Sequence, residues 1–243
     1  MLTTVILCGG LGTRIALVAD GKPKALLPVG GRPFLWYLLQ QLQQQGITHV
    51  VLSTGHLGDQ IADFVRDGSL WPLELCCVRE TTALGTGGAV RLAADTLQLD
   101  EPLLVVNGDT FFSGRVAVLK AFHDARPDAC GSLALAHVAN ASRYGRVGVD
   151  AQTGAVKQFA EKHTGANQAA WINAGMYILE PELVRSIPVA QVVSLEHKVF
   201  PAWVGRGLYG CRIDGAQFLD FGTPADYAKA HSVVHSFHRP VGP

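Results

Sequence analysis

The sequence feature that most constrains the fold is the alternation of short apolar runs with helix-like segments through the first half of the chain. The strand-like runs occupy 3–8, 49–55, 72–80 and 102–109. Segments with a helical spacing of apolar residues occupy 34–46, 57–67, 86–98 and 116–125. Because strands that alternate with such helices form βαβ units, the pattern predicts a mainly parallel sheet covered by helices on both faces.

The second half of the chain is richer in strands. Strand-like sequences there occupy 130–138, 145–150, 155–162, 172–180, 208–214 and 216–222. Two helices are predicted, one over 194–204 and one that begins after Thr223, a residue suited to an N-cap and followed by Pro224. Since no Pro-rich or Ser-rich linker separates the halves, we expect a single α/β domain over 1–243 with a β-rich portion from about residue 130.

The charge balance and the cysteine content indicate which partners the protein lacks and in which cellular compartment we expect it. Lys and Arg number 20 together, as do Asp and Glu, so the formal net charge is zero. A neutral chain has no general attraction to nucleic acid or to an anionic membrane, so we expect neither as a partner. The five cysteines form no Cys-x-x-Cys pair, residues 1–10 lack a basic segment, and no apolar run reaches the length of a membrane span. These features predict a cytoplasmic protein.

A glycine-rich loop follows the first predicted strand. Gly9, Gly10 and Gly12 stand where backbone N–H groups could approach phosphate oxygens, since glycine has no Cβ that would keep a ligand away. Arg14 offers a planar fork suited to a polyphosphate, and Lys24 adds a compact cation. The alternative interpretation is an ordinary glycine turn followed by solvated cations.

Two familiar phosphate-binding patterns do not fit this loop. The dinucleotide-binding fingerprint needs glycine or alanine at the position of Ile15. The Walker pattern needs serine or threonine at the position of Pro23. We therefore interpret residues 7–33 as a phosphate-binding segment of another kind.

A second glycine-rich segment, residues 80–90, joins a predicted strand to a predicted helix. Gly85, Gly87 and Gly88 would allow a flat base or sugar to lie against backbone N–H and C=O groups. A simple turn that opens a helix is the alternative interpretation.

Two carboxylates stand at the ends of apolar runs, Asp109 after a very apolar strand and Asp220 within residues 218–227. In open α/β sheets, ligands bind beyond the carboxyl ends of strands. Mg²⁺ needs only one or two carboxylates when phosphates and waters complete its coordination. Both residues are therefore candidate metal ligands, although Asp109 would also suit a turn and Asp220 would also suit the N-terminus of the following helix.

The string Gly9-Gly10-Leu11-Gly12-Thr13-Arg14, followed by Pro23-Lys24, resembles the first signature of the sugar-1-phosphate nucleotidylyltransferases. The resemblance implies a Rossmann-like, mixed but mostly parallel sheet with helices on both faces and a β-rich sugar-binding portion, as in nucleotide-diphospho-sugar transferases. It also implies that Arg14 acts on the leaving pyrophosphate and Lys24 on the phosphoryl group under attack. The implied nucleotide-binding residues are Leu7, Gly9, Gly10, Gly12, Thr13, Gly85, Thr86 and Gly87.

The resemblance extends to the metal and the sugar. Asp109 and Asp220 look like the family's two carboxylate ligands, which implies Mg²⁺ as the cofactor. The implied sugar-phosphate-binding residues are Gly108, Glu161, Lys162, Asn173 and Gly175. His163 stands where family members commonly have proline after Glu-Lys. The implied parts are a nucleotide-binding half (about 1–130), a sugar-binding half with a return strand (about 131–227), and a C-terminal helix and tail (223–243).

Shorter similarities indicate one subgroup of the family. Residues 107–112, 143–150, 194–201 and 220–227 resemble the heptose 1-phosphate guanylyltransferases. This resemblance implies that GTP and D-glycero-D-manno-heptose 1-phosphate are the substrates, that GDP-sugar and pyrophosphate are the products, and that the reaction serves nucleotide-sugar and polysaccharide biosynthesis. Whether the protein forms a homodimer is left open.

Several alternatives share these motifs. Thymidylyl-, uridylyl- and mannose-1-phosphate guanylyltransferases carry the same first signature. A non-catalytic subunit that senses nucleotide sugars would have the same fold, but the chain retains Arg14, Lys24, Asp109 and Asp220. A glycosyltransferase usually carries Asp-x-Asp, whereas this chain has Asn107 at the first of those positions.

Overall fold

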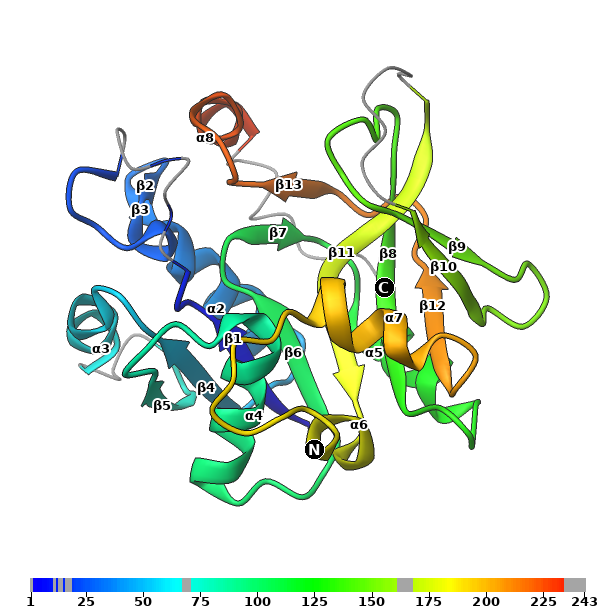
Figure 1. The fold of residues 1–243 in the computed structure, drawn as a ribbon. Helices are drawn as coiled ribbons and strands as arrows, with labels where there is room; N and C mark the ends of the chain where they lie inside the picture. Colours follow the sequence, from blue (N-terminus) through cyan, green and yellow to red (C-terminus); the bar gives the residue numbers. More distant parts are fainter. Residues whose placement is uncertain are drawn as a thin grey trace.

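A mixed sheet forms the centre of the molecule (Figure 1). The computed structural model describes residues 2–10, 12, 15, 19–66, 71–160 and 168–233, with the backbone alone at 160 and 231–233. Within this part of the chain the sheet has nine strands in the order β10-β9-β11-β6-β1-β4-β5, with β8 beside β11 and β12 beside β8. The α/β class and the mixed Rossmann-like sheet predicted from the sequence are confirmed.

The two halves of the chain contribute to this one sheet in different ways. The first half supplies parallel strands, which are β1 (Thr3–Leu7), β4 (His49–Thr54), β5 (Glu74–Arg79) and β6 (Leu103–Asn107). The second half supplies β8 (Gly131–Val138), β9 (Arg146–Val149), β10 (Val156–Ala160), β11 (Ala170–Leu179) and β12 (Leu208–Arg212). Strand β11 joins them, because it runs antiparallel to β6 and to β8.

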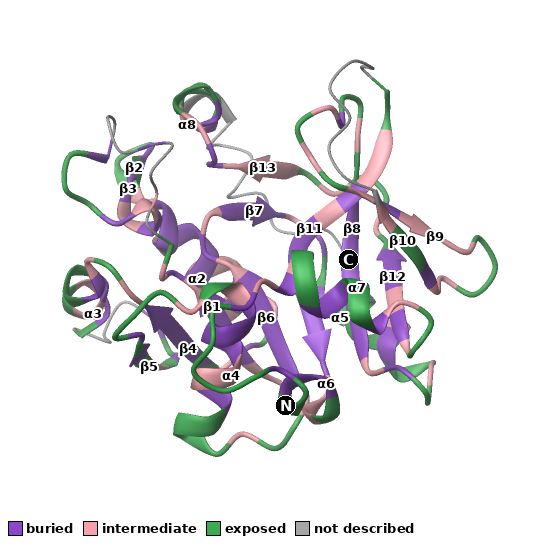
Figure 2. Ribbon diagram, in the orientation of Figure 1, coloured by how far each residue is buried: buried purple, intermediate pink, exposed green. Residues whose placement is uncertain are grey.

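Helices cover both faces of the sheet, as the strand pattern predicts. One face carries α2 (Phe34–Gln44), α3 (Gly58–Arg66) and α5 (Val116–Asp124). The other carries α4 (Gly85–Leu97), α6 (Pro181–Arg185) and α7 (Phe200–Trp203). Side chains alternate between the two cores along each strand. On β6, Leu104 and Val106 face the first core, whereas Leu103 and Val105 face the second. Figure 2 shows the resulting buried centre.

The start of the last helix, α8 (Pro224–Val233), follows the capping signal in the sequence. The Thr223 hydroxyl accepts a hydrogen bond from the Asp226 N–H at 3.3 Å and donates to Asp226 Oδ2 at 2.7 Å. Arg143 forms an ion pair with the same carboxylate, which ties the helix to the loop that precedes β9. None of the helices in the described part of the chain has the length and apolarity needed to span a bilayer.

The structure differs from the predicted elements where they are short or irregular. The helix expected over 194–204 is divided into a π-helical turn, η3 (Leu195–Val199), and α7. Pro201 has no N–H with which to continue an α-helical ladder, and the Val199 N–H instead reaches back five residues to the Ser194 carbonyl. Five further short elements were not predicted, namely η2 (Lys24–Leu26), β2 (Pro28–Val29), β3 (Arg32–Pro33), α6 and β7 (Thr110–Phe112), which is a strand distinct from β6.

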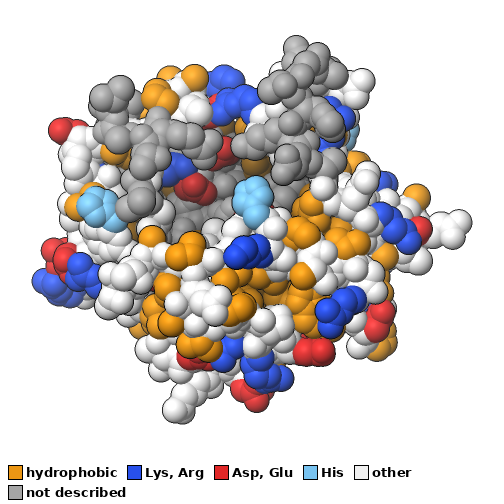
Figure 3. All heavy atoms as spheres, in the orientation of Figure 1, with side chains coloured by type: hydrophobic (Ala, Val, Ile, Leu, Met, Phe, Trp, Pro, Cys, Tyr) orange, Lys and Arg blue, Asp and Glu red, His pale blue; other side chains and the backbone are white. Residues whose placement is uncertain are grey.

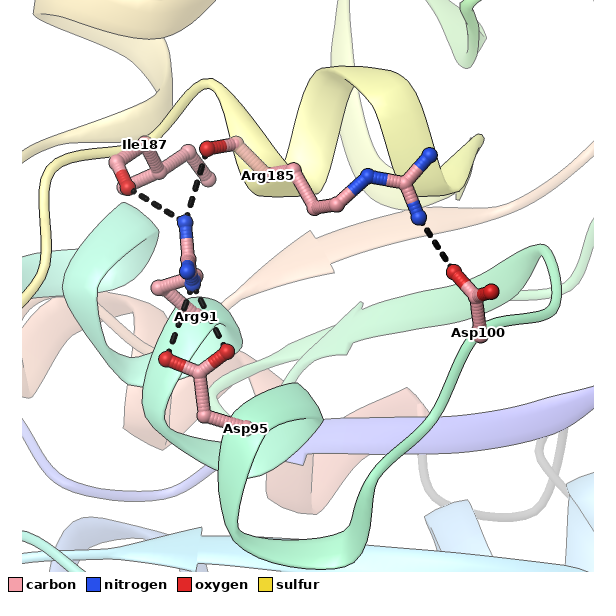
Figure 4. A network of polar contacts seen from close by, with 5 residues as sticks. All are labelled: Arg91, Asp95, Asp100, Arg185 and Ile187. Carbon is pink, nitrogen blue, oxygen red and sulfur yellow. Dashed lines mark hydrogen bonds and ion pairs between the residues drawn. The ribbon is translucent and has the colours of Figure 1, made fainter.

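Arg91 holds the segment between α6 and η3 against α4 (Figure 4). Its Nε donates to both oxygens of Asp95 at 2.8 Å, and its Nη1 donates to the carbonyls of Arg185 and Ile187 at 2.7 and 3.0 Å. Arg185 in turn forms an ion pair with Asp100. The beginning of the segment between α6 and η3 is thereby tied to the middle of α4.

Candidate active site

A cavity of about 410 Å³ opens beyond the carboxyl ends of the parallel strands β1 and β6. Figure 3 shows a hollow on the face of the molecule seen in Figure 1, with acidic and basic side chains in and around it. The described residues that line the cavity are Leu7, Cys8, Gly9, Gly10, Gly12, Ile15, Lys24, Ala25, Glu80, Ala83, Gly85, Thr86, Ala89, Asn107, Gly108, Asp109 and Gly222.

Many of the residues singled out in the sequence line this cavity together. They are Leu7, Gly9, Gly10, Gly12, Lys24, Gly85, Thr86, Gly108 and Asp109. Four others lie outside the described residues, namely Thr13, Arg14, Glu161 and Lys162. Gly87, Asn173, Gly175 and Asp220 are described but do not belong to the cavity lining. The fold therefore unites the first glycine loop with the end of β6, which is about a hundred residues away along the chain.

The candidate catalytic lysine and the candidate metal ligand form an ion pair at the floor of the cavity. Lys24 begins η2, and its Nζ lies 2.6 Å from Asp109 Oδ2. The lysine side chain is 12% exposed and that of Asp109 is 41% exposed, so the carboxylate faces the open space. The Gly108 N–H donates to the Leu7 carbonyl at 3.0 Å, which fixes the backbone before Asp109 against the end of β1.

Strand pairing brings Asp220 beside Asp109. Strand β13 (Phe218–Asp220) runs antiparallel to β7, with Asp220 opposite Thr110, and the Phe221 N–H donates to the Asp109 carbonyl at 3.0 Å. Asp109 in the cavity lining and Asp220 on the neighbouring strand offer hard oxygen ligands, and Mg²⁺ uses such ligands together with substrate phosphates. The described residues thus fit the expected Mg²⁺ site. Within the described ranges, neither this site nor any other place has a group of three or more His, Cys, Asp or Glu side chains that could hold a metal ion.

Glu80 is a cavity residue that the sequence interpretation did not single out. It is 8% exposed, and its Oε2 accepts a hydrogen bond from the Leu84 N–H at 2.8 Å. Its other oxygen lies against Gly9, where a Cβ would come within 2.2 Å of Glu80 Oε1. Burial raises the pKa of the Glu80 carboxyl, and the hydrogen bond from Leu84 opposes that rise. The signal available in the sequence was its place directly after a strand, at the first position of the second glycine segment.

The second glycine segment packs tightly on another part of the chain. The Gly87 N–H donates to the Val193 carbonyl at 2.8 Å, and the Val193 N–H donates to the Leu84 carbonyl at 2.8 Å. A Cβ on Gly85 would lie 2.6 Å from the Val193 oxygen. These glycines are therefore required for the close approach of residues 84–88 to the segment held by Arg91, and the Gly87 N–H is already used within the protein.

A glycine loop, a lysine and a strand-end carboxylate meet at the carboxyl edge of the parallel strands, which is where open α/β sheets bind their ligands. The model of the nucleotidyl transferase family matches residues 3–236. The chain belongs to this family, as its first glycine signature implied.

Individual relatives carry more specific names. The chain is 36% identical over 229 residues to a mannose-1-phosphate guanylyltransferase of Mycobacterium tuberculosis, covering 93% of this chain and 62% of that protein. It is 32% identical over 227 residues to the D-glycero-alpha-D-manno-heptose 1-phosphate guanylyltransferase of Campylobacter jejuni, covering 93% and 97% respectively. The crystal structure of HddC from Yersinia pseudotuberculosis in complex with GMP-PN superposes with a TM-score of 0.82 at 30% identity, covering 96% of this chain and all of that one.

Proposed function

We propose that the protein transfers GMP from GTP to a sugar 1-phosphate, which is D-glycero-D-manno-heptose 1-phosphate, and releases pyrophosphate. The observation that carries this proposal is the meeting of the glycine loop, Lys24 and Asp109 in one cavity. Membership of the nucleotidyl transferase family supports the class of reaction. Similarity to the heptose 1-phosphate guanylyltransferase of Campylobacter jejuni supports the heptose, and the chain spans about 62% of the length of the mannose relative.

The reaction requires one bond to form as another breaks. An oxygen of the sugar 1-phosphate attacks the α-phosphorus of GTP in line, and the bond from that phosphorus to the bridging oxygen of pyrophosphate breaks. Lys24, which lines the cavity, would offset the negative charge that develops at the α-phosphate, so catalysis would consist of positioning and charge stabilisation. By the family resemblance, Arg14 would act on the leaving pyrophosphate and Lys162 would hold the incoming sugar phosphate.

No covalent step on the protein is needed. The thiol that lines the cavity, Cys8, is 7% exposed, and burial raises its pKa far above the ordinary value. A thiol that stays protonated is a poor nucleophile, which supports direct transfer between the two substrates. Asp109 and Asp220 would hold Mg²⁺, which when bound would neutralise charge on the phosphates.

Glu80 supports guanine as the base. A carboxylate accepts hydrogen bonds and donates none. The Watson–Crick edge of guanine presents two adjacent donors, N1–H and the 2-amino group, which one carboxylate can accept together. Uracil and thymine offer a single N–H between two carbonyl oxygens, which a buried carboxylate repels. The position of Glu80 in the cavity therefore favours GTP over UTP or dTTP.

The direct test crosses four nucleoside triphosphates with heptose, mannose and glucose 1-phosphates and measures pyrophosphate release. We expect GTP with D-glycero-D-manno-heptose 1-phosphate to give the highest kcat/KM. A preference for mannose 1-phosphate would leave guanylyl transfer as the reaction but would change the sugar substrate that we propose. If no substrate pair gives pyrophosphate release but the protein still binds a nucleotide sugar, the protein is a sensing subunit and not an enzyme.

Glu80→Gln is expected to weaken the preference for GTP. The variant keeps the size of the side chain but replaces one acceptor oxygen by an NH₂ donor. That donor would face a donor of guanine, so one of the two hydrogen bonds would be lost. We expect kcat/KM for GTP to fall about ten- to hundredfold, equivalent to about 1.5–3 kcal/mol, with values for UTP within about threefold of the parent. Glu74→Gln is the matched control, because Glu74 begins the strand that Glu80 directly follows and is exposed. Equal losses for all four nucleotides would show that Glu80 does not contact the base.

The pH dependence of GTP binding provides an independent check on Glu80. Because burial raises its pKa, Glu80 takes up a proton at a higher pH than an exposed glutamic acid does. The protonated carboxyl can no longer accept from both guanine donors, so KM for GTP should rise as the pH falls towards this raised pKa. The Glu80→Gln variant has no such proton, and its KM should be flatter over the same range. The same pH profile in both proteins would assign the titration to another group.

A further inference from the structure

A series of hydrogen bonds centred on Glu196, at the start of η3, connects the second glycine segment with strand β11. Glu196 Oε2 accepts from the hydroxyls of Thr86 and Ser194, both at 2.9 Å. Its other oxygen, Oε1, accepts from the Tyr177 hydroxyl at 3.4 Å. The Thr86 hydroxyl also accepts from the Leu195 N–H at 2.8 Å. Glu196 thus connects a residue of the cavity wall with the buried strand β11.

The connection continues along β11 to its irregular part. The Asn173 amide donates to the Tyr177 hydroxyl at 2.8 Å, and the Gly175 N–H donates to Asn173 Oδ1 at 2.9 Å. The register of β11 with β8 shifts between Asn173 and Tyr177, which marks a bulge. At this bulge the other edge of β11 changes partner, because Met176 pairs with β6 whereas Ile172 pairs with β9. Tyr177 itself is fully buried, so its hydroxyl has a single fixed environment.

The bulge in turn packs against a wall of the cavity. Gly175 has φ +73°, and a Cβ there would lie 2.9 Å from Asn107 Nδ2. Asn107 lines the cavity and directly precedes Gly108 and Asp109. Its Oδ1 is buried and makes no hydrogen bond within the described structure. The position of the β11 bulge therefore decides where the Asn107 side chain stands beside the candidate metal ligand.

We propose that Glu196 is a positioning residue, which holds the β11 bulge against Asn107 and thereby shapes the sugar side of the cavity. This inference rests on the proposed function, since it names how one substrate's subsite is held in place. Glu196 acts through Tyr177 and needs no contact with substrate. Its three donors are hydroxyls, two at 2.9 Å and that of Tyr177 at 3.4 Å, so one carboxylate joins α4, the start of η3 and β11. Figure 1 shows the segment around α7 lying beside β11 and α4, the two elements that Glu196 joins.

The test compares two single-hydroxyl deletions at the same carboxylate. Tyr177→Phe removes the donor that leads to β11 and retains the aromatic packing. Ser194→Ala removes a different one of the three donors to Glu196 and also the N-cap bond to His197, but it leaves the bonds of β11 in place. We expect Tyr177→Phe to raise KM for the sugar 1-phosphate about three- to tenfold, the range that follows from the loss of one long hydrogen bond of 3.4 Å. KM for GTP should stay within about twofold in both variants, as should the sugar KM of Ser194→Ala.

A double variant and a substrate-free measurement separate positioning from general loss of stability. If the two residues act in one relay, Glu196→Ala combined with Tyr177→Phe should raise the sugar KM no more than the worse single variant. Hydrogen exchange of the Gly175 amide should accelerate in Tyr177→Phe and Glu196→Ala but not in Ser194→Ala, because only the first two release Asn173. Equal sugar KM values in Tyr177→Phe and Ser194→Ala would overturn the inference.

The two proposals fail in different ways. Failure of the proposed function appears as no pyrophosphate release by the unsubstituted protein, whichever substrates are offered. In that case hydrogen exchange, together with calorimetric titration of the sugar 1-phosphate into Tyr177→Phe and Ser194→Ala, still decides the inference. Unchanged exchange at Gly175 in Glu196→Ala overturns it, and selective acceleration with weakened sugar phosphate binding supports it.

Discussion

Asp109→Asn is expected to lower kcat by about two to three orders of magnitude, the usual effect of removing one preorganised stabilising group. The carboxylate stands at the end of β6, is 41% exposed to the cavity, and lies beside the strand that carries Asp220. The amide keeps its shape but loses the anionic oxygen that Mg²⁺ requires. The variant should also bind Mg²⁺ more weakly in calorimetric titrations with a non-reactive GTP analogue, a readout that is independent of turnover.

Folding should be little affected by this substitution. The ion pair with Lys24 is half open to solvent, so its loss should reduce the free energy of unfolding by no more than about 1 kcal/mol. Asp63→Asn is the control, because Asp63 also pairs with a cation, Arg66, but lies far from the cavity on α3. Normal turnover of a folded Asp109→Asn protein at limiting Mg²⁺ would remove Asp109 from the metal site.

Lys24→Ala is the second large effect expected. The lysine side chain is 12% exposed and lies in the cavity between the glycine loop and Asp109, so its charge can act on the reacting phosphate without much screening by water. We expect kcat to fall by the equivalent of about 2–4 kcal/mol, because the charge is needed most in the transition state. KM for the sugar 1-phosphate should change far less than kcat.

Lys22→Ala provides the matched control for this variant. Lys22 lies two positions earlier in the chain and is exposed, so it reports any general effect of lost positive charge near the loop. Its kcat should stay within about twofold of the parent, since exposed charges interact weakly with a buried site. A Lys24→Ala protein with unchanged kcat and a raised sugar KM would place Lys24 at the sugar phosphate instead.

Elements with a local signal were predicted well. Strands β1, β4, β5 and β6 follow runs whose alternation places side chains on two cores, and a run of this kind needs no distant partner to be recognised. The start of α8 was predicted from Thr223 and Pro224, and the capping hydrogen bond from the Asp226 N–H is present. The helix over 194–204 was only partly right, because a residue pattern does not show that Ser194 would accept the π-type bond from Val199.

The residues of the candidate site likewise fall into those with a local signal in the sequence and those without one. Residues of both glycine segments, Lys24 and Asp109 line the cavity and were singled out because each has a local backbone or charge signature. Asp220, on the neighbouring strand, was singled out for the same reason. Glu80 was missed, since its importance depends on Gly9 at the end of another strand, which leaves room for its carboxylate. The link from Glu196 to Tyr177 was missed as well, because hydroxyls and a carboxylate on separate segments have no common spacing in the chain.

The amino-acid sequence by itself determined the succession of strands and helices, the positions where the backbone must approach another group closely, and the residue types available for phosphate and metal. Those properties depend on neighbours within a few residues. Only the tertiary structure decided that Lys24 meets Asp109, that Asp220 lies opposite Thr110, and that β11 joins the two halves of the sheet. Strand order and register arise from packing both faces of the sheet at once, so no local pattern contains them.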